Sequence, residues 1–340
     1  VFFTLCQQLP DGLSASLSDL RSAGKLDALL LDSDFSKTTT IWAGILAMTL
    51  YHTTGYGANQ MIVQRTLGAK NIGDAKKSFL LMGYLAFFIY FFFILLGILF
   101  YHYYGGKTFD NTNTIILEFI STLGIPGLMG LVASAVIAAS MSSLDSAFNA
   151  MSTVSVLDFY QKYIRPDANE QHYLRTTKYF TLAWAILIVI PAILYSTSSG
   201  SVLELVGKIG SYFVGAKLSM YFLGFYSKHT SERGLLIGVF AGMLAVAWGA
   251  TFTTIAWPWY CLIGAGINIP VSIGTSILLD GWQKDWSPHS IPGQKDFFAQ
   301  HKLPQQEKGW YVMPGKVDTS SYGLLLFFVA NLCFLYWFRR

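Results

Sequence analysis

A run of small and hydroxyl-bearing residues at 138–146 carries the clearest chemistry in the sequence. Ala139, Ser142 and Ser143 are spaced i, i+3 and i+4, so a helix places them on one face, and Ser146 follows a turn later. Hard cations such as sodium prefer oxygen ligands, and transporters commonly combine one helix with unwound backbone carbonyls of another. Small residues on one face also allow two membrane helices to pack closely. A cation site and a packing face are therefore both open.

Asp145 adds an ionisable group to this apolar part of the chain. A carboxylate inside a membrane segment is costly, which makes Asp145 a candidate for an ion site or a proton relay. The alternative is a carboxylate that faces water or pairs with a lysine.

A second polar cluster occupies residues 51–60, inside another apolar stretch. Gly55 and Gly57 indicate a helix that breaks and exposes backbone groups, and His52, Tyr56 and Asn59 surround this point. Polar and aromatic side chains at such a break suit a solute site at the membrane midplane. His52 fits equally well as a core histidine whose hydrogen bonds are satisfied.

Lys208 is a further polar group within an apolar stretch, and glycines flank it at positions 207 and 210. The sequence contains no nucleotide-binding loop and no metalloprotease or serine-hydrolase motif, so we do not expect an enzyme.

The elements that position these residues must be membrane helices. The 340 residues are 53% hydrophobic and 12% charged, with a mean hydropathy of +0.45, whereas about a quarter of the residues of soluble domains are charged. Backbone groups inside a bilayer must bond within their own segment, which favours helices. The net charge of +4 is small and the basic residues sit in separate loops, so nucleic acid is not an expected partner.

Apolar stretches long enough to cross a bilayer predict roughly eight spans. They lie at about 38–59, 79–104, 124–160, 174–197, 200–226, 232–252, 256–280 and 320–338. Pro126 and Gly127 suit the start of the third span and Pro166 its end. Basic residues gather in alternate connections, which we assign to the cytoplasm. Arg339 and Arg340 are the exception, because this count places them outside.

Three motifs in sequence order resemble the sodium/solute symporter family, which includes the sodium/glucose cotransporters. They are residues 59–71, residues 142–149 with 158–160 downstream, and Ser211-Tyr212 leading to Ser227-Lys228. The resemblance covers essentially all of residues 1–280.

The resemblance implies an all-α polytopic membrane protein with the LeuT-type inverted-repeat transporter fold. Residues 38–226 would form the second five-helix repeat, 227–280 two peripheral membrane helices, 281–319 an irregular cytoplasmic loop, and 320–340 the last membrane helix. Residues 1–37 would be the end of a helix followed by an external loop. Most of the first repeat would lie upstream of Val1.

The resemblance also implies ion-site residues. By the family's pattern, Ala139, Ser142 and Ser143 bind sodium together with carbonyls of a helix upstream of Val1. Some members hold a second sodium near the positions of Asp145 and Ser146. No organic cofactor is expected, since sodium is the coupling ion.

The solute is less defined, because this sequence departs from its sugar-transporting relatives. Gly55 stands where those relatives have a gating tyrosine, His52 where they have asparagine or a similar polar group, and Gly207 where they have a sugar-binding glutamine. Tyr56 could supply the aromatic group one residue later. Our candidate solute contacts are His52, Tyr56, Asn59 and Lys208.

These observations predict sodium-coupled symport of a small polar solute, a sugar or a related polyol or organic solute, by a multi-pass protein of a plasma membrane such as the bacterial inner membrane. One alternative is a transporter-like sensor or scaffold that binds solute without moving it. Another is proton-coupled symport through Asp145. The oligomeric state stays open.

Overall fold

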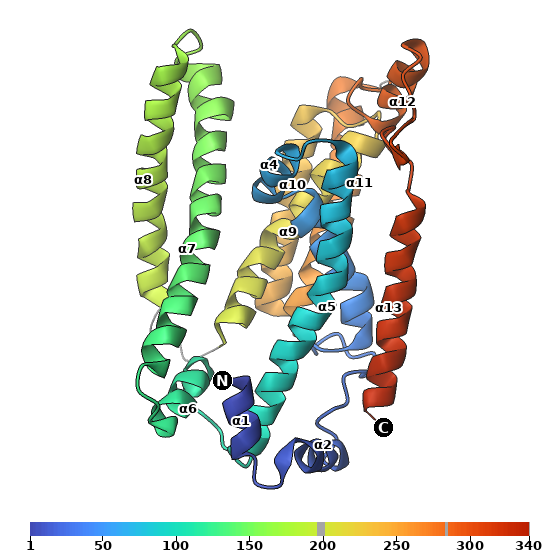
Figure 1. The fold of residues 1–340 in the computed structure, drawn as a ribbon. Helices are drawn as coiled ribbons and strands as arrows, with labels where there is room; N and C mark the ends of the chain where they lie inside the picture. The colour runs from blue at the N-terminus through green and yellow to red at the C-terminus, as the bar shows by residue number, and fades with distance from the viewer. Residues whose placement is uncertain (196–200, 283–284, 340) are drawn as a thin grey trace. The chain divides into compact units, whose positions relative to one another are not determined.

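A computed structural model describes residues 1–195, 201–282 and 285–339 of the chain (Figure 1). Residues 196–200, which include the predicted end of the 174–197 span and the predicted start of the 200–226 span, lie outside this description, as do residues 283–284 and Arg340. Among the described residues, six helices are long and apolar enough to cross a membrane. They are the segments Ile72–Tyr103, Leu128–Ile164, Glu170–Tyr195, Glu232–Phe252, Trp257–Asp280 and Thr319–Phe338. The expected all-α polytopic architecture is confirmed.

The chain divides into two compact units. The first contains residues 1–58, 66–107 and 203–340. Its helices are α1 (Phe2–Gln8), α2 (Gly12–Ser22), a π-helical segment (Ala43–Met48), α3 (Thr49–Gly57), α5 (Ile72–Tyr103), α9 (Val202–Tyr226), α10 (Glu232–Phe252), a 3₁₀ turn (Trp257–Trp259), α11 (Tyr260–Asp280), α12 (Ile291–Gln300) and α13 (Thr319–Phe338). Two short strands, β1 (Gln306–Glu307) and β2 (Trp310–Tyr311), form an antiparallel hairpin before α13.

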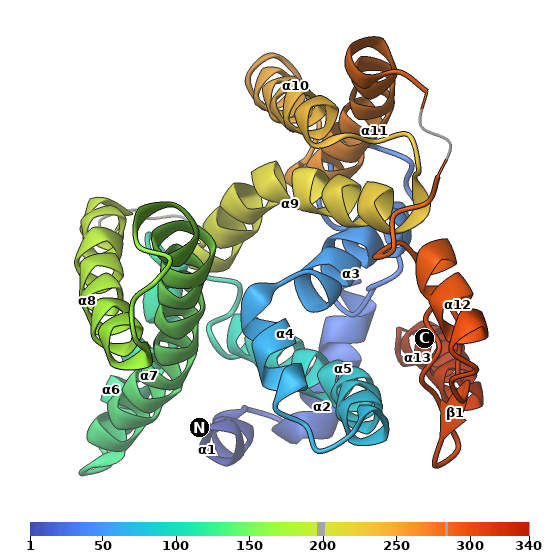
Figure 2. The same ribbon diagram turned by 90° about the horizontal axis from the view of Figure 1, so that it is seen from above.

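The second unit contains residues 59–65 and 108–202. Its helices are α4 (Gln60–Leu67), a 3₁₀ turn (Thr112–Thr114), α6 (Ile115–Leu123), α7 (Leu128–Val154), a π-helical segment (Ser155–Ile164) and α8 (Glu170–Tyr195). Helices α7 and α8 run side by side in both views (Figures 1 and 2).

The limits of α7 follow from backbone chemistry. Gly124 ends α6 in the left-handed region at φ 59°, and Gly127 precedes α7 at φ 80°, a conformation that suits glycine. The helix begins at Leu128 and its π-helical extension ends at Ile164, two residues before Pro166. The predicted start and end of this span are therefore correct.

Helices α10 and α11 pack closely through small residues (Figure 2). Gly234, Gly238 and Gly242 recur every fourth residue of α10, and α11 opposes them with serines, Asn268 and a glycine. A Cβ atom at Gly238 would lie 2.7 Å from the Asn268 carbonyl oxygen, and one at Gly242 would lie 2.6 Å from the Gly264 carbonyl oxygen. Both distances are too short for a side chain. The regular spacing of glycines on α10 therefore allows the two helices to approach this closely.

Helix α13 packs along α5 through aromatic rings. The Phe91 ring lies 5.3 Å from Phe334 and 5.5 Å from Phe338, and Tyr84 lies 5.0 Å from Phe327, with the rings at steep angles. Such edge-to-face pairs stabilise helix contacts beyond the apolar area that they bury.

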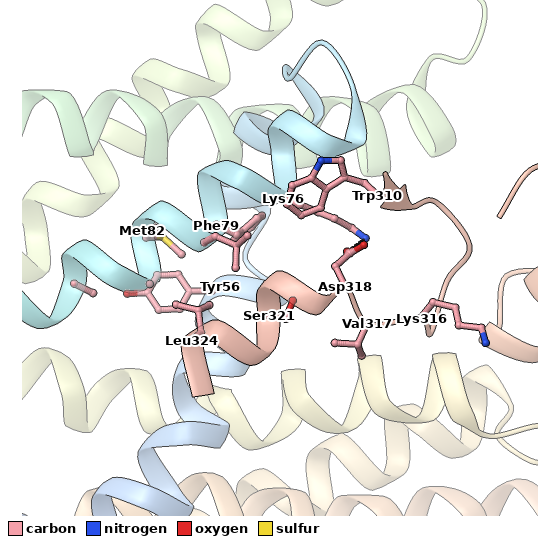
Figure 3. Close-up of a pocket in the computed structure, with 13 residues that line it drawn as sticks. Tyr56, Lys76, Phe79, Met82, Trp310, Lys316, Val317, Asp318, Ser321 and Leu324 are labelled. Atoms are coloured by element: carbon pink, nitrogen blue, oxygen red, sulfur yellow. Dashed lines mark hydrogen bonds and ion pairs between the residues drawn. The ribbon is translucent and has the colours of Figure 1, made fainter. Parts of the chain in front are cut away.

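A polar contact joins the beginnings of these two helices (Figure 3). Lys76 of α5 forms an ion pair with Asp318, the residue before α13, and donates to the Tyr311 carbonyl oxygen at 2.6 Å. The Tyr311 N–H in turn donates to Asp318 at 2.8 Å. The hydrogen bond from Lys76 holds the pKa of the buried Asp318 carboxyl below its usual value.

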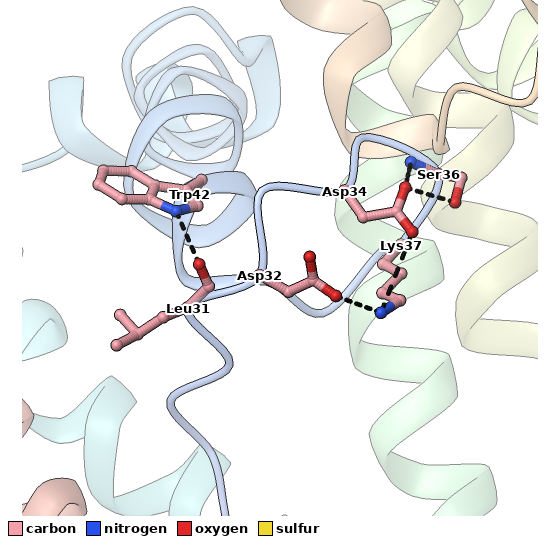
Figure 4. Close-up of polar contacts among 6 residues, drawn as sticks. All are labelled: Leu31, Asp32, Asp34, Ser36, Lys37 and Trp42. Atoms are coloured by element: carbon pink, nitrogen blue, oxygen red, sulfur yellow. Dashed lines mark hydrogen bonds and ion pairs between the residues drawn. The ribbon is translucent and has the colours of Figure 1, made fainter.

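The segment before the π-helical turn is held by local polar contacts (Figure 4). Lys37 pairs with Asp32, which raises the pKa of Lys37. The Ser36 hydroxyl and N–H donate to Asp34 at 2.7 Å and 2.9 Å, which lowers the pKa of Asp34. The Trp42 indole N–H donates to the Leu31 carbonyl oxygen at 3.3 Å. These contacts fix the entry of the chain into the helix that carries His52.

The expected irregular segments contain helices that we missed. The external loop before residue 38 includes α2, the connection between the predicted spans 79–104 and 124–160 includes α6, and the 281–319 loop includes α12 and the hairpin. The prediction of an irregular 281–319 loop was wrong because the Ser290 hydroxyl caps α12 by accepting from the Gly293 N–H at 3.2 Å, with Pro292 in the first turn.

Two expected spans are helical but are not among the six apolar helices. The 38–59 stretch is divided into a π-helical segment and a short α3. Helix α9 has sufficient length, but Glu204, Lys208 and Lys217 interrupt its apolar sequence. Both remain predicted spans.

Substitution Gly238→Val should destabilise the protein by about 1–3 kcal/mol, because the added methyl groups enter the α10–α11 contact. The melting temperature of the purified protein in detergent measures this. Gly266→Val on α11 is the matched control, since a Cβ atom at Gly266 meets nothing within 4 Å. An equal decrease in melting temperature for Gly238→Val and Gly266→Val would contradict the close contact between α10 and α11.

Substitution Asp318→Asn should lower the melting temperature at pH 7 by an amount that corresponds to about 1–2 kcal/mol. The folded-state pKa of Asp318 is lowered, so the stability that its carboxylate contributes is fully present above the ordinary aspartate pKa of 3.8 and is lost as the pH falls through the lowered pKa. The difference between wild type and variant should therefore shrink in acid. Asp167→Asn, at an exposed position, should show no such pattern.

Candidate functional site

The predicted sodium ligands lie in the middle of α7. Ala139, Ser142 and Ser143 are all exposed within the second unit. Among the described residues, the hydroxyls of Ser142 and Ser143 make no hydrogen bond, whereas the neighbouring Ser140 hydroxyl donates to the Val136 carbonyl oxygen at 2.8 Å. The oxygens of Ser142 and Ser143 therefore have no protein partner among the described residues and are available to an external ligand.

Ser146 has a different environment. Its hydroxyl accepts a hydrogen bond from Arg65 of α4 and lies 3.2 Å from the Ser142 carbonyl oxygen. Because the guanidinium group is positively charged, a cation at this oxygen would meet electrostatic repulsion. Asp145 is exposed and forms no ion pair with a described residue. A second ion site at Asp145 and Ser146 stays a prediction.

Arg65 lies within the first family motif, but the sequence did not indicate a contact for its side chain. Its bond to Ser146 joins this motif, residues 59–71, to the 142–149 motif within the second unit. The two positions are 81 residues apart. The only sequence feature that links Arg65 to Ser146 is that each lies in one of the family motifs.

The helix that carries His52 is interrupted close to the predicted glycines. Helix α3 ends at Gly57 and α4 begins at Gln60. Gly55 and Gly57 are themselves helical, and the break falls at Ala58 and Asn59. The Asn59 side-chain oxygen accepts from the Met61 N–H at 3.1 Å and so supports the first turn of α4. Asn59 belongs to the second unit, whereas His52, Tyr56 and Lys208 belong to the first.

His52 and Tyr56 lie together in an aromatic cluster. Their rings stack at 5.8 Å with an angle of 19°, and the edge of Tyr51 lies 5.6 Å from His52. Tyr51 also contacts Trp257 at 6.1 Å. The structure therefore brings two predicted solute contacts together and adds two aromatic residues that the sequence analysis did not name.

The glycines around Lys208 make room for this cluster. A Cβ atom at Gly210 would lie 2.6 Å from the Tyr51 hydroxyl, and one at Gly207 would lie 2.9 Å from the Trp257 ring. Lys208 itself is exposed on α9, and its carbonyl oxygen accepts from the Ser211 hydroxyl at 2.7 Å. The close approach of these aromatic rings explains why glycine occupies both positions 207 and 210.

Tyr56 also lines a cavity of about 490 Å³ in the first unit (Figure 3). Phe79, Met82 and Leu324 form its apolar wall. The Tyr56 ring lies at the end of the cavity away from the pair of Lys76 and Asp318. Among the described residues, no three His, Cys, Asp or Glu side chains form a group that could hold a metal ion.

Six apolar helices, an interrupted helix and seams of small residues define a polytopic α-helical membrane protein. A model of the sodium:solute symporter family matches residues 14–242. The chain belongs to the sodium:solute symporter family, whose members are transporters and not enzymes.

The curated relatives include cotransporters for different solutes. Sodium/glucose cotransporter 4 of Mus musculus is 28% identical over 221 residues, which cover 60% of this chain and 32% of that protein. The sodium/myo-inositol cotransporter of Bos taurus is 29% identical over 260 residues, which cover 69% of this chain and 35% of that protein. The chain thus spans about a third of the length of these relatives.

A solved structure shares the fold. It shows a Na⁺-coupled sialic acid symporter in a substrate-bound, outward-open state, and it matches with a TM-score of 0.69 at 20% sequence identity. The match covers 82% of this chain and 58% of that chain. The expected LeuT-type fold is confirmed.

Proposed function

We propose that this chain is part of a sodium-coupled symporter that moves a small polar solute, such as a sugar or a polyol, across a plasma membrane. Membership of the family supports this, as do the relatives named for glucose and myo-inositol. The observation that carries the proposal is the pair of hydroxyls at Ser142 and Ser143, which make no hydrogen bond among the described residues and lie on an apolar helix.

The sodium ion would bind at Ala139, Ser142 and Ser143. Sodium loses much of its hydration when it enters an apolar protein, so neutral oxygens must replace its water ligands. Two hydroxyls and the backbone carbonyl of Ala139 supply part of this shell, and carbonyls of a partner helix would complete it. Sodium binding would stabilise the conformation that binds solute, which is thermodynamic linkage between two sites.

The solute would bind near His52, Tyr56 and Lys208 of the first unit, and Asn59 of the second unit stays a predicted contact. The stacked rings of His52 and Tyr56 offer flat faces to the C–H surface of a cyclic polyol, and the imidazole offers a hydrogen-bonding edge. Tyr51 and Trp257 support this pair from the side of α9.

A proton-coupled cycle through Asp145 is a second candidate. The observation that favours it is an exposed carboxylate without an ion-pair partner among the described residues, on a helix that is otherwise apolar. A sensor that binds solute without moving it would retain the same ligands.

Sodium-dependent uptake by the full-length protein tests the sodium site. Ser142→Ala and Ser143→Ala should each raise the sodium concentration for half-maximal uptake about tenfold or more, because each removes one oxygen ligand worth on the order of 1.5 kcal/mol. Ser140→Ala is the matched control, since its hydroxyl already bonds to its own helix. Uptake that persists when choline replaces sodium would exclude the mechanism, and solute binding without uptake would favour a sensor.

Substitution Asp145→Asn separates the two coupling ions. With sodium coupling at the serine site, the variant should keep sodium-dependent uptake. With proton coupling, uptake driven by a pH gradient should be lost in the variant while solute binding remains. Solute uptake into vesicles with an imposed sodium gradient, or with an imposed pH gradient in the absence of sodium, measures the two outcomes, and equilibrium binding of labelled solute measures the retained binding.

A further inference from the structure

We propose that the seam between α5 and α13 holds an anionic phospholipid at the end of the two helices that lies opposite to the Lys76–Asp318 contact. The proposal concerns the first unit alone, and the cavity contains none of the residues proposed for sodium or solute. It requires that α5 and α13 lie in a bilayer, as their length and apolarity indicate.

The cavity at this end has an amphipathic lining. Its volume is about 390 Å³, within the range of about 300–1,000 Å³ typical of small-molecule sites. Side chains of α5 between Phe87 and Ile98 form one wall, and Leu335 and Phe338 of α13 form another. The segment 25–28 closes the end and contributes Lys25 and Asp27. Every other side chain of the lining is apolar or aromatic.

The cavity opens at the surface of the first unit. Tyr90 is 56% exposed and Ile94 is 61% exposed, although both line the cavity. Exposed apolar side chains on a spanning helix meet acyl chains in a bilayer. An acyl chain can therefore extend from the lipid phase into the cavity.

Three cations surround the polar end of the cavity. Arg21 donates to the Phe338 carbonyl oxygen at 3.2 Å, and the Lys25 ammonium lies 4.7 Å from the centre of the Tyr101 ring. Arg339 forms an ion pair with Asp27 at 3.1 Å. Arg21 and Lys25 have no carboxylate partner among the described residues, and Asp19, the nearest acid along α2, forms no ion pair there. The rim therefore carries an excess of positive charge.

This combination fits the shape and charge of an anionic phospholipid. Basic side chains at the end of membrane helices bind phosphate headgroups, and the adjoining apolar cavity accepts a chain. A soluble anion would gain nothing from the aromatic walls, and a zwitterionic lipid would gain less from the excess positive charge. A bound lipid would contact α5, α13 and the 25–28 segment together, and would hold the last span against the core.

Native mass spectrometry of the full-length protein tests the proposal, with phosphatidylglycerol and phosphatidylcholine added in equal amounts to detergent micelles. The wild-type protein should retain phosphatidylglycerol in preference to phosphatidylcholine. Lys25→Gln should reduce that preference about fivefold, the effect of one basic side chain near an anionic headgroup. Lys162→Gln is the matched control, because Lys162 also lies over a tyrosine ring, at 5.2 Å, but in the second unit.

A second variant tests the cavity without a change of charge. Ile94→Trp should fill the cavity and reduce retention of both lipids while solubility and sodium-dependent uptake persist. Equal retention of the two lipids by wild type would overturn the proposal, as would equal behaviour of Lys25→Gln and Lys162→Gln. Thermal stabilisation by inorganic phosphate equal to that by phosphatidylglycerol would also overturn it, since a free anion site would then explain the basic rim.

Discussion

The absence of water in the bilayer core requires every backbone N–H and C=O group of a span to find a partner within the protein. Regular helices meet this requirement alone, so each irregularity in a span needs a specific partner. The π-helical segment 43–48 has one in Cys261, whose thiol lies 3.3 Å from the Ala47 carbonyl oxygen. The interruption at Ala58 and Asn59 has another in the Asn59 side chain. His52 and Tyr56 lie on α3, the helical segment between these two irregularities, and Asn59 lies at the second of them.

The two serine stripes of the chain show why residue type alone does not separate packing from ion binding. Ser272 and Ser276 of α11 are buried against glycines of α10, and their hydroxyls bond to Asn268 and to the Ser272 carbonyl oxygen. Ser142 and Ser143 of α7 also lie among small residues on one helix face. They are nevertheless exposed, and their hydroxyls make no hydrogen bond among the described residues. The first stripe uses its hydroxyls for helix packing. The second leaves them available, which is the physical basis of the sodium proposal.

Local signals predicted the long elements well. Pro126, Gly127 and Pro166 act on the residues next to them, and the limits of α7 and its extension follow from them. The short helices α2, α6 and α12 have 11, 9 and 10 residues and were missed because the search for spans recognises only apolar stretches of about 20 residues. The contacts of Arg65 with Ser146 and of Gly210 with Tyr51 join distant positions, and no local periodicity encodes them. The sequence thus predicted which residues share one face of a helix. It did not predict which residues of other helices contact them.

The arrangement of the last span bears on the charge pattern that set the predicted topology. Helices α5 and α13 run in the same direction, with Lys76 and Asp318 at their beginnings and the 25–28 segment at their ends (Figure 1). Both must then enter the membrane from one side, as the basic loops before each of them predict. Arg339 was the exception to this pattern, since it falls on the opposite side. Its ion pair with Asp27 places the outward arginine beside a carboxylate of the predicted external loop. The basic loops before α5 and α13 still set the predicted orientation, because the pattern counts lysines and arginines over all the connections and does not depend on one residue.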